Sequence, residues 1–458
     1  MIDPRLAEVV KAYDVRGLSP EQLDPDLTRA LGEAFAIETG IDQGRGTAVI
    51  GHDMRDTSPV LAEAFAAGVR AQGGDVIGIG LASTDLLYFA SGDFNLPGAM
   101  ITASHNPAAY NGIKLCRAGA KPIGYDSGLS AIAERATTIL NGSGLQRTEL
   151  PEPTGSYEER DALTRYATYL HEIVPIPAGR RLEVVADAGN GMAGHTVPSV
   201  FATLDVELTP MYFELDGTFP NHDANPLDHS TLVDLQARVR ERGADIGLAF
   251  DGDADRCFVV DETGAVVSPS AITGLIAHRA LIATPGATIL HNVITSKAVP
   301  EIITENGGTA VRTPVGHSLI KAEMARTGAV FGGEHSGHFY FKDFFLADSG
   351  MIAALHVMAA LAETEGTVSE LMAQYERYVA SGEINSTVED GPAILAELTE
   401  TYGDLPQDTM DGLTVTADTW WFNVRASNTE PLLRLNVEGD DEATMARVRD
   451  DVLAVIRG

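Results

Sequence analysis

The sequence predicts three similar mixed-sheet α/β domains followed by a smaller C-terminal α+β domain. The first observation is length, because 458 residues exceed the ~250–300 residues at which a single hydrophobic core stops growing. The second is a unit of short apolar strand, polar loop, helix and second strand that occurs three times, which is typical of parallel strands covered by helices. The third is a change of pattern near residue 375.

Each copy of the unit begins at a short apolar strand. The first copy follows an expected helix at 25–37 and consists of a strand at 47–50, a loop at 51–58, a helix ending at 70 and a strand at 75–79. The second begins at 182–186, and the third consists of a strand at 288–290, a loop at 295–297, a helix ending at 304 and a strand at 309–313. Because the copies share this order, we expect three domains of one class.

The C-terminal part has a different pattern. Strands are expected at 420–424 and 432–437, on either side of a tight turn, with an amphipathic helix at 440–456. This order is typical of an antiparallel sheet covered by a helix. Together with turn-rich stretches near 141–156 and 261–264, it predicts domains at 1–145, 152–258, 259–372 and 378–458.

The charge of the chain argues against one class of partner. It has 32 basic and 65 acidic residues, a net charge of −33, so we expect no nucleic acid, whose binding needs a basic surface. A phosphate ligand is compatible with this charge, because surface charges beyond about 8 Å are mostly screened at physiological salt. One cation at ~4 Å contributes on the order of 4 kcal/mol at an effective dielectric of 20, so a local basic cluster can bind phosphate.

The sequence also predicts a cytoplasmic protein that does not enter a membrane. Its first residues lack the basic and apolar regions of a signal peptide. The longest apolar run, at 351–362, is shorter than the ~18–20 residues of a membrane span, and we expect a buried helix there. Two cysteines, Cys116 and Cys257, are too few for a disulfide framework and fit a reducing compartment.

The segment TASHNP at 102–107 carries the candidate nucleophile. An apolar stretch at 96–101 leads to Ser104 beside His105, Asn-Pro then turns the chain, and Lys114 follows ten residues after the serine. We interpret it as a nucleophile loop. A lone Ser-His pair is more often a helix cap or a satisfied turn, so the interpretation depends on three polar loops further along the chain.

The segment DGDADR at 251–256 is the candidate metal site. Asp251, Asp253 and Asp255 alternate after an apolar strand, and alternate carboxylates in an extended loop can converge on a Mg²⁺ ion that also keeps a phosphate ligand. A calcium EF-hand loop is rejected, because Arg256 occupies the position that needs glycine and both flanks resemble strands. A solvated acidic turn is the structural alternative.

The segment GNGMAG at 189–194 matches the dinucleotide-binding pattern GxGxxG, with Glu214 and Asp216 at about the expected distance downstream. A single match of this kind is weak. The other two copies of the unit lack these glycines, and a tight turn before a helix explains them without a nucleotide.

Three further loops carry groups suited to a sugar phosphate. In GEHSGH, Glu334 and Ser336 are placed to bind neighbouring hydroxyls, and His317 of TPVGH lies at a strand end, where functional groups of such sheets gather. In RASNT, Arg425 is combined with hydroxyls, an amide and turn N–H groups, a mixture that suits a phosphate dianion. Taken singly, the loops also fit a polar loop, a helix start and an arginine paired with an acidic neighbour.

With TASHNP, DGDADR, GEHSGH and RASNTEP in this order, the sequence resembles the α-D-phosphohexomutases, and within them the bacterial phosphomannomutase/phosphoglucomutase group. The likeness runs over essentially the full length, and four motifs in order are highly specific. It implies a central cleft where the domains meet, with phosphorylated Ser104 and the three aspartates of DGDADR holding Mg²⁺.

The resemblance also assigns expected roles to further residues. The catalytic positions that it implies are Ser104, His105, Lys114, Arg256 and His317, with His105 and His317 as candidates for proton transfer. Glu334 and Ser336 would bind sugar hydroxyls, and Arg425, Ser427, Asn428 and Thr429 the phosphate that does not react. The remaining substrate-binding positions are Tyr13, Arg16, Lys297 and His338.

The implied activity is interconversion of hexose 1-phosphate and hexose 6-phosphate, for mannose and also glucose. It would proceed through a phosphoserine and a hexose 1,6-bisphosphate, which is both intermediate and activator. The expected partners are hexose phosphates, and the chain is expected to be a monomer or a homodimer. GEHSGH lacks the glutamine that glucosamine-phosphate mutases typically have in third place, which favours mannose and glucose phosphates. The alternatives are a phosphoglucosamine mutase, a serine-dependent metal phosphatase acting on sugar phosphates, and a non-catalytic sugar-phosphate sensor.

Overall fold

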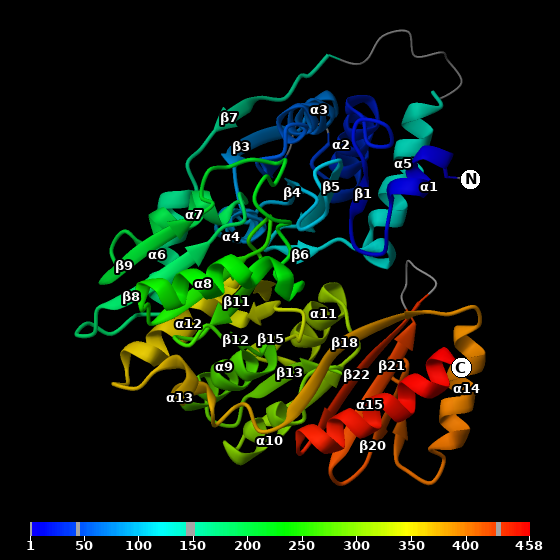
Figure 1. Ribbon diagram of the computed structural model, residues 1–458. Helices are drawn as coiled ribbons and strands as arrows, with labels where there is room; N and C mark the ends of the chain where they lie inside the picture. The colour runs from blue at the N-terminus through cyan, green and yellow to red at the C-terminus, as the bar shows by residue number, and fades with distance from the viewer. Residues whose placement is uncertain (1, 43–45, 143–151, 427–431) are drawn as a thin grey trace. The chain divides into compact units, whose positions relative to one another are not determined.

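The computed structural model in Figure 1 describes residues 2–42, 46–142, 152–426 and 432–458. They form two compact units, Met1–Val266 with Gly337–Val368 and Val267–Ser336 with Ser369–Gly458. The first unit contains two α/β domains, and the second contains the elements of a third α/β domain and an α+β domain. The predicted fold class is confirmed: three α/β domains precede a smaller domain with an antiparallel sheet.

The first domain has a mixed sheet covered by helices. Its strands are β1 (Val15–Leu18), β2 (Thr47–His52), β3 (Asp75–Leu81), β4 (Gly98–Ile101), β5 (Tyr110–Arg117), β6 (Lys121–Pro122) and β7 (Tyr157–Glu159). Its helices are α1 (Pro4–Val9), α2 (Pro25–Thr39), α3 (Ser58–Ala71), α4 (Thr84–Phe94) and α5 (Leu129–Leu140). The sheet order is β1-β5-β4-β2-β3-β7, with β6 beside β5. β4, β2, β3 and β7 are parallel, whereas β5 is antiparallel to β1 and β4.

Local sequence explains where α2 begins and ends. The side chain of Asp24 accepts a hydrogen bond from Leu27 N at 2.7 Å, and Pro25 occupies the first helical position, which are favourable N-terminal features. Gly40 ends the helix in the left-handed region, at φ 72°, where glycine has no Cβ penalty. The helix lies beside α3 and α5 (Figure 1) and buries Phe35 against Phe65.

The second domain repeats the arrangement with a smaller sheet. Its strands are β8 (Leu182–Asp187), β9 (Val206–Met211), β10 (Ile246–Phe250) and β11 (Cys257–Val260), with β12 (Val266–Val267) at the boundary between the units. Its helices are α6 (Leu163–Ile173), α7 (Ala193–Phe201) and α8 (Val233–Arg242). The order is β11-β10-β8-β9, in which β10, β8 and β9 are parallel and β11 is antiparallel to β10.

Later residues complete the first unit. They form β16 (Phe339–Phe341), β17 (Ala347–Asp348) and α12 (Gly350–Ala362). The apolar run expected as a buried helix is α12, which packs against β11 and begins after Ser349, whose hydroxyl accepts a hydrogen bond from Ile352 N at 3.1 Å. In the described ranges, the length and apolarity that a bilayer crossing requires are not combined in any one helix.

The second unit contains the three parallel strands of one sheet and a complete antiparallel sheet. The α/β elements are α9 (Pro269–Ala283), β13 (Thr288–Asn292), α10 (Ala298–Glu305), β14 (Thr309–Thr313), α11 (His317–Thr327) and β15 (Phe331–Gly333), with β13 parallel to β14 and β15. After α13 (Val368–Met372) come β18 (Val379–Thr387), α14 (Gly391–Thr401), β19 (Gln407–Asp408), β20 (Leu413–Thr416), β21 (Trp420–Ala426), β22 (Leu432–Gly439) and α15 (Glu442–Arg457). The last sheet has the order β18-β22-β21-β20-β19 and is antiparallel throughout.

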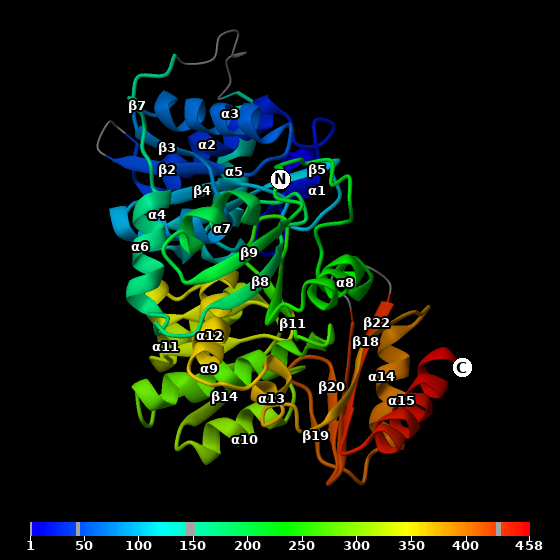
Figure 2. The same cartoon turned by 60° about the vertical axis from the view of Figure 1, so that its left-hand side comes forward.

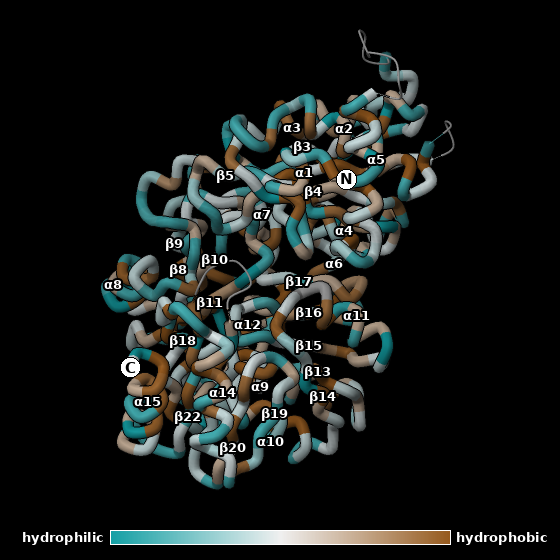
Figure 3. Tube along the Cα trace, turned by 90° about the vertical axis from the view of Figure 1, so that its right-hand side faces the viewer, coloured by the Kyte–Doolittle hydropathy of each residue, from teal (hydrophilic) through white to brown (hydrophobic). Residues whose placement is uncertain are grey.

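Two helices cover one face of the last sheet. Figure 2 shows α14 and α15 on the same side of the strands, and α15 packs on β18 and β22. The mixed teal and brown colour of α15 in Figure 3 reflects an amphipathic sequence. Its buried residues are spaced three or four positions apart, which places them on one helical face: Met445, Val448, Val452 and Ile456.

Candidate active site

The serine loop connects β4 to β5 in the first domain. Ser104 adopts a left-handed conformation with φ 51°, which is unfavourable for a residue other than glycine and often marks a functional turn. Its N–H donates to Thr102 Oγ1 at 2.9 Å, and Asn106 N donates to Ala103 O at 3.0 Å. These bonds turn the chain sharply after β4 and fix the direction of the serine side chain.

A buried arginine holds this loop from behind. The Arg55 side chain is 1 % exposed, and its Nη2 donates to Ser104 O at 2.8 Å and Asn106 O at 2.6 Å. Its Nη1 donates to Pro107 O at 2.9 Å and Tyr110 O at 3.0 Å. One planar guanidinium thus binds three carbonyls of the serine loop and one at the start of β5, a geometry that a lysine cannot reproduce.

The metal loop lies directly against the serine loop. Residues 251–256 connect β10 to β11, which pair antiparallel with Phe250 opposite Cys257, so strands flank the loop as expected. A Cβ on Gly252 would lie 2.4 Å from Ser104 O, so only glycine permits this approach. The aspartates of the loop are buried although they are charged, which requires compensating partners.

Side chains from both loops form one hydrogen-bonded network. Ser104 Oγ donates to Asp251 Oδ2 at 3.0 Å, and Arg256 Nε donates to the same oxygen at 2.9 Å. Lys114, on β5, lies 2.6 Å from Oδ2 of both Asp253 and Asp255. The predicted nucleophile, carboxylates and basic residues of the first two domains therefore meet in one cluster.

The charges of this cluster shift each other's pKa values. Burial would lower the pKa of Lys114, but Asp253 and Asp255 outweigh it and raise that pKa well above its usual value. Burial would raise the pKa of Asp253, but the adjacent Lys114 lowers it. Burial raises the pKa of Asp251 to about 7, against the opposing effect of Arg256. The site is thus built around ionised Lys114 and Asp253.

The carboxylates are arranged as a cation site requires. One ligand oxygen from each of Asp251, Asp253 and Asp255 lies within 4.8 Å of the others. Among the described residues, Oδ1 of Asp253 and Oδ1 of Asp255 are buried without a hydrogen-bond partner, which is costly unless another group, such as a metal ion, binds them. Hard carboxylate oxygens suit a divalent cation such as Mg²⁺, so these residues fit a metal.

Two histidines border the cluster, and their pKa values are shifted in opposite directions. Burial lowers the pKa of His105 well below its usual value, and Arg256 and Arg16 lower it further, so its imidazole is neutral. Its Nδ1 accepts a hydrogen bond from Arg256 and lies 3.2 Å from Ser104 Oγ. Burial would lower the pKa of His338, but Asp255 and Asp348 raise it, and His338 Nδ1 lies 2.9 Å from Asp348 Oδ2.

The other predicted residues of the first unit lie at β1. Arg16, on this strand, donates from Nη1 to Ala103 O at 3.0 Å and also to Asn106 Oδ1. It therefore contacts the serine loop through the Ala103 carbonyl and the Asn106 side chain. Tyr13 lies just before β1 and is half-buried.

The second unit holds the predicted sugar loop. Glu334, which is 2 % exposed, accepts hydrogen bonds at 3.2 Å from Asn292 Nδ2 and from Gly316 N. Ser336 is half-buried. His317 is the first residue of α11, and its side chain lies outside the described part of the structure. Glu334 is thus fixed beside the segment that leads into His317.

The predicted phosphate clamp is described in part. Arg425 lies on β21 and donates from Nη2 to Glu383 Oε2 at 2.9 Å, so the arginine has the acidic neighbour that the structural alternative anticipated. Ser427, Asn428 and Thr429 lie outside the described residues. Lys297, just before α10, is 2.9 Å from Asp440 Oδ1 and 3.9 Å from the ring centroid of Tyr378.

The glycines of the dinucleotide-like segment are explained by packing. A Cβ on Gly191 would lie 2.7 Å from Gly252 O, and one on Gly194 would lie 2.3 Å from Phe213 O. Two of the three motif glycines therefore permit close approach of backbone to backbone. Gly191 in particular lets the turn after β8 support the metal loop.

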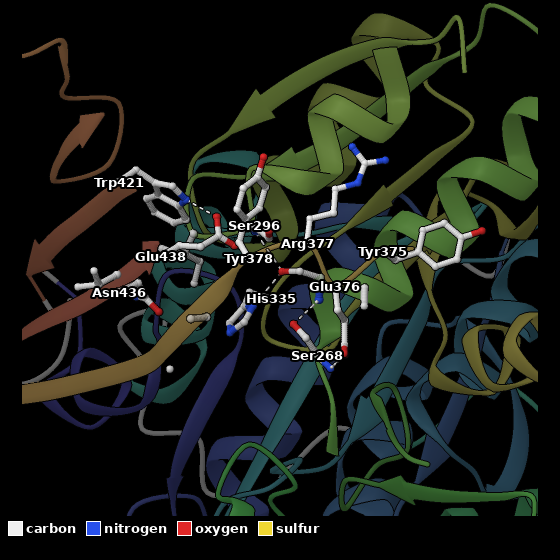
Figure 4. Close-up of a pocket in the computed structure, with 16 residues that line it drawn as sticks. Ser268, Ser296, His335, Tyr375, Glu376, Arg377, Tyr378, Trp421, Asn436 and Glu438 are labelled. Carbon is white, nitrogen blue, oxygen red and sulfur yellow. Dashed lines mark hydrogen bonds between the residues drawn. The ribbon is translucent and has the colours of Figure 1, made fainter. Parts of the chain in front are cut away.

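A separate cavity of about 170 Å³ lies within the second unit (Figure 4). Its lining includes His335, whose Nδ1 is 3.0 Å from Ser270 Oγ, and Glu438, which accepts a hydrogen bond from Trp421 Nε1. The predicted site residues are not among its lining residues. Figure 4 shows Glu438 beside Trp421 and Tyr378.

Several residues that hold the site were missed from the sequence. Thr84 Oγ1 donates to Asp253 Oδ2 at 2.5 Å, and Arg55 binds the serine loop. Glu383 and Asp440 pair with Arg425 and Lys297, which are predicted to bind substrate. Arg55 had a signal, because it follows β2, which neighbours β4 in the parallel part of the sheet, and strand ends gather at one edge. The other residues are far in sequence from the side chains they bind, so no local pattern pointed to them.

Comparison with known proteins agrees with this geometry. Models of the four phosphoglucomutase/phosphomannomutase domains match the chain: α/β/α domain I at residues 7–142, domain II at 164–264, domain III at 268–378 and the C-terminal domain at 383–455. Phosphohexose mutases of Xanthomonas campestris pv. campestris (strain B100) are 40% identical over 98% of this chain and 99% of the relative. A phosphomannomutase of Escherichia coli is 37% identical over 98% of each chain.

A solved structure supports the same assignment. It is a phosphoglucomutase/phosphomannomutase family protein from Burkholderia thailandensis, with a TM-score of 0.88 and 31% identity, and the match covers 100% of this chain and 98% of that one. All four domains are therefore matched in order, by sequence and by structure, along nearly the whole chain. The chain belongs to the phosphoglucomutase/phosphomannomutase family of phosphohexomutases, as its four motifs predict.

Proposed function

We propose that the chain interconverts hexose 1-phosphate and hexose 6-phosphate, of mannose and of glucose, through phosphorylated Ser104. The observation that carries the proposal is the 3.0 Å separation of Ser104 Oγ and Asp251 Oδ2 inside a buried acidic cluster. It brings a nucleophilic hydroxyl to a cation site, as phosphoryl transfer needs. Relatives named phosphomannomutase and phosphomannomutase/phosphoglucomutase support hexose phosphates as substrates.

The reaction consists of two balanced transfers. In the first, the P–Oγ bond of phospho-Ser104 breaks, a bond forms from phosphorus to the free O6 or O1 of the sugar, the proton of that hydroxyl passes to a base, and Ser104 Oγ takes up a proton to become the free hydroxyl. The product is a hexose 1,6-bisphosphate. In the second, the bond between the other phosphate and its sugar oxygen breaks, a bond forms from that phosphorus to Ser104 Oγ, the serine proton passes to a base, and the released sugar oxygen takes up a proton to give the isomeric monophosphate. The neutral imidazole of His105, 3.2 Å from Ser104 Oγ, is one candidate base, and His317 is the other.

Positive charge at the transfer site supports this chemistry. Asp251, Asp253 and Asp255 would hold Mg²⁺ together with an oxygen of the phosphoserine, and the unpartnered Oδ1 atoms of two of them fit that role. Bound there, the ion would neutralise charge on the transferring group. Lys114 and Arg256, both within the cluster, would contribute in the same way.

The other predicted residues would bind the rest of the substrate. Glu334 and Ser336 would accept and donate hydrogen bonds to sugar hydroxyls, and His338 would contribute a further contact to the substrate. Arg425, Ser427, Asn428 and Thr429 would bind the phosphate that does not react, and Tyr13, Arg16 and Lys297 would contribute further contacts to the substrate. Because there is one phosphoserine and one phosphate clamp, the two ends of the sugar would exchange places between the transfers.

We also propose a cytoplasmic location, which the buried thiols of Cys116 and Cys257 favour.

A coupled assay tests this function. Mannose 1-phosphate, glucose 1-phosphate and glucosamine 1-phosphate are each supplied with Mg²⁺ and the matching 1,6-bisphosphate, and formation of the 6-phosphate is measured beside release of inorganic phosphate. We expect isomer formation from the mannose and glucose esters. Preferred conversion of glucosamine 1-phosphate would establish the glucosamine mutase, phosphate release without isomer would establish a phosphatase, and calorimetric binding without turnover would establish a sensor.

A further inference from the structure

Lys297 is held at its backbone and at its side chain by the end of one strand. It is the residue before α10, and that helix has no side-chain cap of its own. Lys297 N donates to Glu438 Oε2 at 3.0 Å, and Lys297 Nζ donates to Asp440 Oδ1 at 2.9 Å. Glu438 is on β22, and Asp440 is the first residue after this strand. The lysine and these two acidic residues all lie in the second unit.

Glu438 is a fixed anchor. It is 3 % exposed and also accepts a hydrogen bond from Trp421 Nε1 on β21, as the dashed line in Figure 4 shows. A carboxylate at a helix N-terminus is favoured by the helix dipole, and two N–H donors satisfy it. The backbone of Lys297 is thereby bound to the sheet that also carries Arg425, the predicted phosphate-binding residue of β21.

Asp440 is a more weakly held partner. Its side chain is 43% exposed and that of Lys297 is 23% exposed, so water and salt screen their attraction. The backbone of Asp440 is fixed independently, because its N–H donates to Thr419 O at 2.9 Å. The Lys297 ammonium also lies 3.9 Å from the ring centroid of Tyr378, a cation–π contact that does not depend on Asp440. The carboxylate is therefore replaceable while the lysine stays in position.

We propose that Asp440 is the resting counter-ion of Lys297 and that a phosphate oxygen of the substrate replaces it, while Glu438 and Tyr378 keep the lysine in place. The inference rests on the proposed function, in which Lys297 binds the hexose phosphate substrate. Asp440 competes with that phosphate and so limits affinity, whereas Glu438 is a positioning residue that supports it. Two acidic residues, two positions apart on the chain, are thus expected to have opposite effects.

Steady-state kinetics with mannose 1-phosphate test whether Asp440 and Glu438 have opposite effects on KM. Asp440→Asn is expected to lower KM about two- to fivefold at low salt, the range that an exposed ion pair is worth, with kcat unchanged and a smaller effect at high salt. Glu438→Ala is expected to raise KM about tenfold through loss of a charge-assisted hydrogen bond. Glu438→Gln, whose amide oxygen can accept from Lys297 N, is expected to recover much of this loss.

Controls separate the proposal from general effects of charge or folding. Asp450→Asn removes the same charge from an exposed site on α15 and is expected to leave KM unchanged. In a Lys297→Met background, Asp440→Asn is expected to have no further effect, because the pair no longer exists. Melting temperatures show whether Glu438→Ala acts only through stability, and Glu438→Gln serves if Glu438→Ala does not fold.

The outcomes distinguish failure of the counter-ion exchange from failure of the proposed mutase function. Suppose the wild-type chain converts hexose phosphates, but Asp440→Asn raises KM or has the same KM as Asp450→Asn. The exchange of counter-ions is then wrong, and the mutase function stands. If Asp440→Asn changes KM equally in the Lys297→Met background, the exchange is also wrong. If the wild-type chain forms no isomer from any of the three sugar phosphates, the proposed function is wrong, and this inference falls with it.

Discussion

Ser104 Oγ lies 3.0 Å from Asp251 Oδ2, although 147 positions separate the two residues. The contact exists because the loops after two strands, β4 and β10, meet within one compact unit. Gly252 leaves room for the serine backbone, and Arg55 holds that backbone from the other side.

Ser104→Ala is expected to abolish isomer formation and phosphoprotein formation together. The alanine lacks the oxygen that would carry the phosphoryl group, and the loop backbone remains held by Arg55. Incubation with a ³²P-labelled 1,6-bisphosphate, followed by protein precipitation, measures the phosphoprotein. Ser130→Ala, in α5, is the matched control and should keep both signals. Turnover by Ser104→Ala at the wild-type rate would refute the role of this serine.

Arg55→Lys is expected to reduce kcat by at least about 100-fold, because displacement of the nucleophile by ~1 Å has that effect. A lysine keeps the charge but cannot bind the four carbonyls that Arg55 binds. We also expect a loss of about 2–3 kcal/mol in the free energy of unfolding, measured by urea denaturation. Arg165→Lys, at an exposed site on α6, should change neither quantity. Wild-type kcat in Arg55→Lys would show that the clamp does not position Ser104.

Gly252→Ala is expected to separate the serine and metal loops, because its Cβ would lie 2.4 Å from Ser104 O. Backbone atoms cannot yield as a flexible side chain can, so we expect loss of about 1–3 kcal/mol of stability, as overpacking costs, together with weaker metal activation. The measurements are thermal unfolding and the Mg²⁺ concentration for half-maximal rate. Gly391→Ala, whose nearest neighbour is Leu433 Cδ2 at 3.4 Å, should leave both unchanged. An unaltered Mg²⁺ requirement would contradict the close packing.

Chelation of divalent cations is expected to remove activity while the fold persists, and added Mg²⁺ should restore it. Binding to the folded state alone also stabilises it, by ~2.7 kcal/mol when the ion is present at 100 times its Kd. Thermal unfolding should therefore shift upward with Mg²⁺ in the wild-type protein and not in Asp253→Asn. Circular dichroism of the chelated protein checks that secondary structure is retained. Equal rates with and without Mg²⁺ would refute the proposal that the three aspartates hold a metal ion needed for activity.

Asp85 is expected to make stability depend on pH between about 4 and 6. Burial raises the pKa of Asp85 to about 6, although hydroxyls of Ser349, Ser83 and Tyr166 oppose the shift. In this window the unfolded chain has lost the proton that the folded chain still binds, so stability falls as pH rises. The cost at neutral pH is about 3 kcal/mol from a shift of roughly two pKa units.

The variant Asp85→Asn should lose this dependence and be more stable than wild type at pH 7. The measurement is the difference in free energy of unfolding between variant and wild type, followed from pH 4 to pH 7 in urea. Asp126→Asn, at an exposed position, provides the matched control. A difference that does not change across this range would mean that Asp85 is ionised throughout in the folded protein.

The sequence by itself determined the class of each domain and the four loops that carry chemistry. Strand and helix periodicities are local, so they predicted the elements around Ser104 and Asp251 without tertiary information. The order of the motifs predicted the family, which the comparisons confirm. From the same patterns, GNGMAG was predicted to be a tight turn and not a nucleotide-binding loop. The close packing of Gly191 against the Gly252 carbonyl explains why glycine is needed there.

Only the tertiary structure decided which side chains support these loops. Arg55 binds main-chain carbonyls, which every residue possesses, so no residue pattern points to its partners. Thr84 and Lys114 reach Asp253 across 169 and 139 positions, and Asp440 reaches Lys297 across 143. Burial and these long-range charges also set the pKa values of the cluster. Local sequence fixes what each segment is, whereas contacts between distant segments fix the charge and position of its functional groups.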